Sequence, residues 1–219
     1  MTRNVFDREL NQLNDDLIQM GNMAEEAIEK VMLALREKDK VAAVEVIEGD
    51  EVVDAMERRI ESRCLKLLLH QQPVARDLRV ISTALKMITD IERICDQAAD
   101  IAEILLRFIE QQYIKEPEHI MMMADIATTM VKRGIDAYVY QDVEMAKKVI
   151  AMDDEVDDLF GVIKNELIDL AANGEANKDQ IIDFLMIAKY LERIGDHAEN
   201  IAEWVIFAVT GMHKKERII

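Results

Sequence analysis

The sequence has little of what interrupts helices or crosslinks chains. Its 219 residues include 7 glycines, 2 prolines and 2 cysteines, and aromatic residues make up 5%. The scarcity of glycine and proline favours helix over almost the whole length. Cys64 and Cys95 form no CxxC pair and predict no disulfide framework. We interpret both as small hydrophobic residues of the core.

Long apolar runs and net positive charge are also missing. No apolar stretch approaches the roughly 18 residues that a membrane span needs. The first ten residues lack the apolar segment of a secretory signal. A net charge of −17 would repel phosphate backbones and anionic lipid headgroups. We therefore expect a cytoplasmic protein that binds no nucleic acid, does not insert into a membrane, and attracts cations and basic partner surfaces.

One phrase of thirteen residues occurs twice. Residues 91–103 read IERICDQAADIAE and residues 191–203 read LERIGDHAENIAE, so that most positions are identical. The similarity extends upstream, because segment 50–54 matches segment 153–157. Such self-similarity at a fixed spacing is typical of a duplicated structural unit. We predict a first copy in residues 1–115 and a second copy in residues 116–219.

Apolar residues recur at helical spacing along both copies. Asp39 and Asp142 occupy matching positions where a helix N-cap is expected, and Asn177 with Gln180 resembles a capping box. The predicted helices cover about residues 4–37, 39–70, 75–112, 117–140, 142–173 and 177–210. Long helices with short connections pack antiparallel. The predicted fold is therefore all-α, with six long helices arranged as two tandem three-helix repeats in one bundle.

Carboxylates follow one side of the helix that carries each repeated phrase. At about 100° per residue, Glu92, Asp96 and Asp100 fall within one arc, opposite the isoleucines that we assign to the core. Glu192 and Asp196 repeat this arrangement in the second copy. We expect both stripes to face outward.

A further pair of carboxylates lies on the helix before each stripe. These pairs are Asp50 with Asp54 and Asp153 with Asp157. Like charges four residues apart destabilise a helix by a few tenths of a kcal/mol, whereas ordinary amphipathic helices also expose charged stripes. The spacing therefore leaves two interpretations, a solvated surface or a set of metal ligands. Oxygen ligands suit cations such as Mg²⁺, Mn²⁺, iron or Ca²⁺.

Motifs of common catalytic sites are missing. The sequence contains no glycine-rich phosphate loop, HExxH or GxSxG segment. Ferritin-like two-metal enzymes need Glu-x-x-His on a bundle helix, and the spacing from Glu116 to His119 spans Pro117. These observations favour a protein that is not an enzyme. A carboxylate-bridged metal enzyme or a metal-storage bundle remains the alternative.

Taken together, the motifs resemble those of the PhoU family, the phosphate-specific transport system accessory proteins. The resemblance rests on the duplicated E-R-I-[CG]-D phrase and on residues 72–79, QPVARDLR, and it covers essentially the whole chain. It implies two three-helix units, a homodimer, and clusters of divalent or trivalent metal ions (iron, zinc, manganese or magnesium) on ExxxD or DxxxD motifs. The matching positions are Glu92, Asp96, Asp100, Glu192, Asp196, Asp50, Asp54, Asp153 and Asp157.

Two residues depart from the family's pattern. Cys95 replaces the usual glycine in the first copy, which places a thiol beside the stripe, and Asn200 removes one charge from the second. We therefore expect the second cluster to be smaller or to bind metal more weakly. Arg93 and Arg193 are expected either to contact a partner or to pair with the acid three residues on.

In function, the resemblance implies a negative regulator of phosphate uptake and of the phosphate-starvation response. Its expected partners are the ATPase of a phosphate ABC transporter and a sensor histidine kinase, between which it would act as an adaptor. An acidic bundle without affinity for anionic lipid would have to be recruited to the membrane by protein partners.

Overall fold

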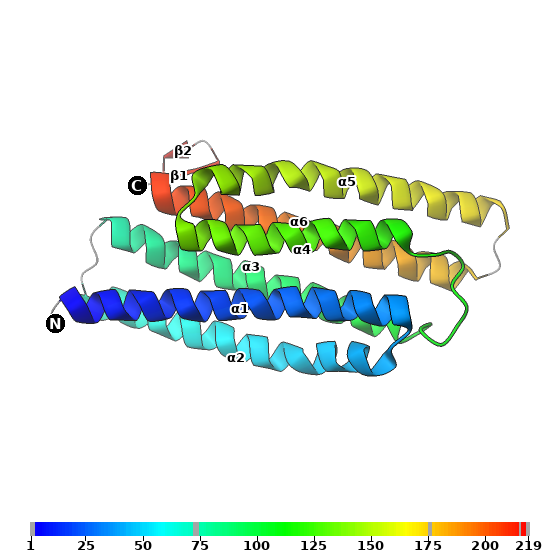
Figure 1. Ribbon diagram of the computed structural model, residues 1–219, viewed down its shortest axis with the longest axis horizontal. Coiled ribbons are helices and arrows are strands. Elements are labelled where there is room, and N and C mark those ends of the chain that lie inside the picture. Colours follow the sequence, from blue (N-terminus) through cyan, green and yellow to red (C-terminus); the bar gives the residue numbers. More distant parts are fainter. Residues whose placement is uncertain (1–2, 72–74, 175–176, 215, 218–219) are drawn as a thin grey trace.

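The structure is a computed structural model that describes residues 3–71, 75–174, 177–214 and 216–217. Helices make up most of this part of the chain, and two very short strands follow the last helix (Figure 1). The elements are α1 (Arg3–Glu37), α2 (Lys40–Gln71), α3 (Ala75–Leu105), α4 (Glu118–Tyr140), α5 (Val143–Ala172), α6 (Lys178–Thr210), β1 (Met212–His213) and β2 (Glu216–Arg217). The predicted all-α fold is confirmed. Among the described residues, no helix is long and apolar enough to cross a membrane.

The helices form two groups of three that share one core. The chain places α1–α3 and α4–α6 side by side along their length (Figure 1). Helix α3 packs against α6 and α1 packs against α4, whereas α2 and α5 contact helices of their own copy. The buried apolar side chains of all six helices form a single continuous cluster. The matching helices of the two copies therefore enclose one interior.

Side-chain caps fix three helix starts where they were predicted. Asp39 Oδ1 accepts hydrogen bonds from the backbone N–H groups of residues 41 and 42, at 2.9 and 3.1 Å. Asp142 Oδ1 accepts from residues 144 and 145, at 2.9 and 3.0 Å. Asn177 Oδ1 accepts from the N–H of Gln180 at 3.1 Å. The predicted capping box is only half present, because the Gln180 side chain instead accepts from the N–H of Ile114 at 2.6 Å.

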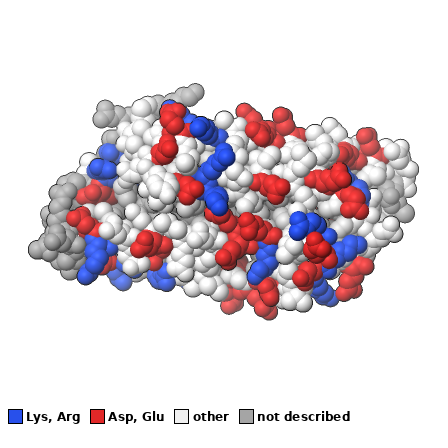
Figure 2. Space-filling model, in the orientation of Figure 1, with Lys and Arg blue, Asp and Glu red and all other residues white. Residues whose placement is uncertain are grey.

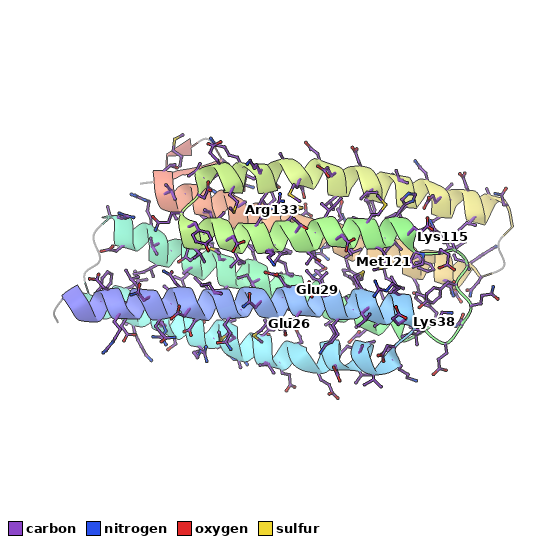
Figure 3. The ribbon with its side chains drawn as sticks, in the orientation of Figure 1. Glu26, Glu29, Lys38, Lys115, Met121 and Arg133 are labelled. Atoms are coloured by element: carbon purple, nitrogen blue, oxygen red, sulfur yellow. The ribbon has the colours of Figure 1, made fainter. Side chains whose placement is uncertain are left out.

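The prediction for the end of the third helix was wrong. Helix α3 ends at Leu105 rather than near residue 112. The chain then forms turns in which N–H groups bond to carbonyls three or four residues back. The apolar periodicity continues because Phe108 is still buried, with its ring 5.3 Å from that of Phe184. The connection between α3 and α4 is fixed in part by Lys38, which donates to the carbonyl of Gln111 at 2.7 Å. Lys115, also in this connection, lies at the same end of the bundle (Figure 3).

Candidate functional site

Six carboxylates from α2 and α3 gather in the first copy, because the two helices pack together with their acidic stripes facing. The first acidic cluster consists of Asp50, Asp54, Glu57, Glu92, Asp96 and Asp100. The stripe on α3 does not face open solvent as expected, since the side chain of Glu92 is 15% exposed and that of Asp96 is 26% exposed. The predicted ligands of this copy therefore lie along the contact between α2 and α3.

Burial and mutual repulsion shift the proton affinities of this cluster. Burial raises the pKa of Glu92 to about 7, and the neighbouring Asp96 reinforces the shift while Arg93 opposes it. Burial also raises the pKa of Asp50, and repulsion from Asp96 adds to it. Asp50 Oδ1 is buried without a hydrogen-bond partner in the described part of the chain. The cluster thus carries more negative charge than its surroundings compensate.

A cavity of about 230 Å³ opens beside this cluster, between α1 and α2. Asp50, Cys95 and Gly49 are among the residues that line it. A side chain at position 49 would meet nothing within 4 Å, whereas the matching position of the second copy carries Met152. Burial, reinforced by Asp50, raises the pKa of the Cys95 thiol, which keeps it protonated. This agrees with our interpretation of Cys95 as a small core residue rather than a ligand.

The second copy has a corresponding but different cluster between α5 and α6. The second acidic cluster consists of Asp153, Asp154, Asp157, Asp196, Glu199 and Glu203. Burial raises the pKa of Asp153 to about 6, and repulsion from Glu199 and Asp196 adds to it. A Cβ atom on Gly195 would lie 3.1 Å from Asp153 Oδ1, so the glycine lets this carboxylate lie directly against α6.

Glu192 is already paired with a cation. Lys189, three residues earlier on α6, pairs with the Glu192 carboxylate, and its ammonium lies 5.6 Å from the ring centre of Phe160. In the first copy the matching positions carry Thr89, whose hydroxyl donates to Glu57 at 3.4 Å. The position three residues before the repeated glutamate therefore carries a hydroxyl group in the first copy and a cation in the second.

Sequence reasoning missed Glu199. The residue at the matching position of the first copy is Ala99, so the repeat carries no signal for it. Glu199 does lie three residues after Asp196, on the same side of the helix, and it directly precedes Asn200. Asn200 replaces the carboxylate that Asp100 provides in the first copy, and Glu199 supplies a carboxylate one position earlier.

The two arginines beside the stripes behave differently. Arg93 Nη1 lies 2.7 Å from Asp96 Oδ2, and its Nε lies 3.4 Å from Glu92 Oε2, so the expected pair with the acid three residues on is present. The charge of Arg193 acts instead across the α3–α6 contact on Asp100, which also accepts a hydrogen bond from the Tyr190 hydroxyl. Arg93 therefore already neutralises part of the first acidic cluster.

The histidine of the Glu-x-x-His spacing contacts a glutamate of α5 rather than Glu116. His119 Nδ1 lies 2.7 Å from Glu166 Oε1, and Lys115 pairs with the other oxygen of the same carboxylate. The contact joins α4 and its preceding connection to α5. It places no histidine beside either acidic cluster.

The donor chemistry of both clusters fits a hard or borderline cation. Every cluster member offers carboxylate oxygens, the ligand type that magnesium, manganese and iron accept. Asp50 Oδ1, buried and unpartnered, is the kind of atom that a cation would satisfy. Within the described part of the chain, no three acidic, histidine or cysteine side chains already stand close enough to hold one ion. Binding would therefore require side-chain rotation.

Comparison with known proteins places these features in a family. The model of the PhoU domain matches residues 17–105 and 120–205. The chain is 38% identical, over 96% of its length and 97% of the relative, to the phosphate-specific transport system accessory protein PhoU homolog of Clostridium acetobutylicum. It is 35% identical to the corresponding homolog of Aquifex aeolicus, over 85% of this chain and 84% of the relative.

Solved structures agree with the fold. The chain is similar to the crystal structure of PhoU from Pseudomonas aeruginosa, with a TM-score of 0.91, 31% identity, and coverage of 94% of this chain and 100% of that chain. It is also similar to the phosphate transport system regulatory protein PhoU from Streptococcus pneumoniae, with a TM-score of 0.89 and 28% identity, over 95% and 98% of the two chains.

Proposed function

Because this chain belongs to the PhoU domain family, we propose that it is a cytoplasmic accessory protein that represses phosphate uptake and the phosphate-starvation response without being an enzyme. The observation that carries the proposal is the likeness over the full bundle to relatives named phosphate-specific transport system accessory proteins. Its proposed partners are the ATPase of the phosphate transporter and a sensor histidine kinase. A homodimer is part of the same proposal.

Metal occupancy of the two acidic clusters is proposed as the input to this regulator. In the first cluster, Asp50, Asp54, Glu92, Asp96 and Asp100 would hold the ions. In the second, Asp153, Asp157 and Asp196 would do so with Glu199 and Glu203. Glu192 would first have to leave Lys189. Burial and repulsion now raise the pKa values of Glu92 and Asp153. A bound cation would supply positive charge that favours the ionised carboxylates and so offsets both effects.

The output of the regulator would be its surface charge. Acidic side chains are spread widely over the face that α1 and α4 present in Figure 2, and the chain carries a net charge of −17. Filling the clusters with cations would reduce that charge locally. Since electrostatic complementarity governs encounter rates and partner choice, occupancy would change the affinity for a basic surface on the ATPase or the kinase.

Metal content tests the input directly. We would compare wild type with Glu92→Gln/Asp96→Asn/Asp153→Asn/Asp196→Asn by elemental analysis after purification without chelator. A control variant carries four amide substitutions at exposed acids outside the clusters, namely Glu37, Glu48, Glu118 and Glu144. Metal bound to wild type and control but lost from the cluster variant is the expected result. Equal metal in all three proteins would refute the proposed sites.

The output is tested in cells with a phosphate-starvation reporter in a strain that lacks the native gene. Wild type and the control variant should restore repression, whereas the cluster variant should not. A cluster variant that folds, has lost its metal and still represses normally would show that metal is not the signal. The accessory role would then stand without it.

A further inference from the structure

A short hairpin after α6 lies at the end of the second acidic cluster. The helix stops at Gly211, whose φ of 77° is left-handed, and the chain turns back through β1 and β2, which pair antiparallel with residue 213 opposite residue 216. Figure 1 shows the hairpin at the end of the bundle where α6 finishes. The turn therefore brings residues beyond the last helix onto the bundle.

An aromatic stack holds the hairpin in place. The His213 imidazole lies on the indole of Trp204, with ring centres 4.0 Å apart and planes 13° from parallel. Trp204 also meets the edge of Phe207 at 5.8 Å. Trp204 is the only tryptophan in the chain. Its fluorescence therefore reports on the position of β1 without a label.

The stack places an ammonium group against the second acidic cluster. Lys214 Nζ lies 3.1 Å from Glu203 Oε2, and its charge also acts on Glu199. The Glu203 side chain is 16% exposed, whereas that of Lys214 is 61% exposed. The cation is thus at the solvent side of a partly buried carboxylate.

The described residues of the first copy show no such feature. Glu103, which matches Glu203, forms no ion pair with any side chain that the structure describes, and α3 is followed by the turns after Leu105 rather than by a hairpin. The cations paired with acids of the first cluster, Arg58 and Arg93, each belong to the same helix as the acids they contact. Lys214 instead reaches its cluster from outside the helix bundle.

We infer that Lys214 is a tethered cation that competes with metal ions for Glu203 and Glu199 and so weakens metal binding at the second acidic cluster. The inference rests on the proposed metal-binding function. Because Lys214 is adjacent to His213, an ion that displaces the ammonium also shifts β1 on Trp204. A tethered group competes at a high effective concentration, yet a largely exposed ammonium is held weakly enough for a divalent ion to displace it.

The test isolates the second cluster with Glu92→Gln/Asp96→Asn, which disables the first. In this background we would titrate Zn²⁺, which does not quench indole by paramagnetism, and follow binding by calorimetry and by Trp204 emission at low salt. Adding Lys214→Gln should raise the Zn²⁺ affinity by about two- to fivefold, the range that a surface ion pair supports. Lys214→Arg, which keeps the charge, should restore the lower affinity.

Lys30→Gln is the matched control, because it removes the same charge from an exposed ion pair in the other copy, with Glu45 at 2.9 Å. It should leave Zn²⁺ affinity unchanged. Zn²⁺ that binds equally tightly with and without Lys214, or that leaves Trp204 emission constant, would overturn the inference while leaving the proposed sites intact. If Zn²⁺ bound to none of these proteins, wild type included, both proposals would fall together.

Discussion

His197 Nδ1 lies 2.9 Å from Asp90 Oδ1, and this contact joins α6 of the second copy to α3 of the first. The two side chains are 21% and 15% exposed, so the contact is largely shielded from water. The matching residue of the first copy, Gln97, is 5% exposed, and its Oε1 is buried without a hydrogen-bond partner among the described residues. Of these two equivalent positions, the one in the second copy has a polar partner, whereas the buried oxygen of the one in the first copy has none among the described residues.

The same substitution at these two positions should have opposite effects on stability. Gln97→Met removes a buried unsatisfied oxygen and should raise the free energy of unfolding by about 1 kcal/mol. His197→Met leaves Asp90 without its partner and should lower it by about 1–3 kcal/mol. Urea denaturation followed by circular dichroism measures both. Shifts of equal sign would mean that packing volume, not hydrogen bonding, decides these positions.

Two helical glycines offer a second matched pair. A Cβ atom on Gly21 of α1 would lie 2.8 Å from Cγ1 of Ile135 in α4, so Gly21→Ala should lower the free energy of unfolding by about 1–3 kcal/mol through overpacking. A Cβ atom on Gly161 would meet nothing within 4 Å. Gly161→Ala should therefore raise the free energy by about 0.5–1 kcal/mol. Thermal and urea unfolding check both values, and a stabilised Gly21→Ala variant would contradict the close α1–α4 contact.

Stability of the metal-free protein should fall as the pH rises toward neutrality. The pKa of Glu92 is raised from its ordinary value of 4.5 to about 7, and that of Asp153 from 3.8 to about 6. Between those values the folded state binds more protons than the unfolded state, so unfolding becomes easier as the pH increases. The stabilisation is complete below about pH 4 and is lost as the pH rises through about 6 and 7.

This pH dependence is measured by urea unfolding in the presence of EDTA between about pH 5 and pH 8. Glu92→Gln/Asp153→Asn should flatten the profile relative to wild type, because an amide cannot titrate. The exposed-acid substitution Glu48→Gln should leave it unchanged. Identical slopes for wild type and the double variant would place the titrating groups elsewhere.

Metal binding should be linked to protons in the same pH range. At about pH 6.5 part of the Glu92 population is protonated, and a cation that binds there must release that proton. We expect Zn²⁺ affinity to rise between about pH 6 and pH 8, with calorimetric heats that depend on the ionisation enthalpy of the buffer. Buffer-independent heats at pH 6.5 would show that the ions bind away from Glu92.

The helices could be predicted because their signals are local or repeated. Asp39 and Asp142 cap helices at equivalent positions through hydrogen bonds to N–H groups two and three residues on. Such contacts depend on the residue and its immediate neighbours. The end of α3 was not predictable in this way, since Phe108 stays apolar and buried while its backbone leaves the helix to reach Phe184.

The candidate site was predictable to the extent that the duplication marked it. The angular position of Glu192 places it on the acidic stripe, but periodicity alone does not show that Lys189 pairs with it. Glu199 has no counterpart in the first copy and so gave no repeat signal. The hairpin depends on the stacking of His213 on Trp204. This is a tertiary contact, and neither residue belongs to a sequence motif that would predict it.

The single apolar interior shared by the two copies has a consequence for how the chain unfolds. Neither group of three helices can open without exposing the face that the other covers, chiefly along α3 and α6. Subglobal opening of one half should therefore be suppressed, and unfolding should be one cooperative event. The amide protons of α3 and α6 would then exchange with solvent last, at a common rate set by the whole molecule, although their sequences lie a hundred residues apart.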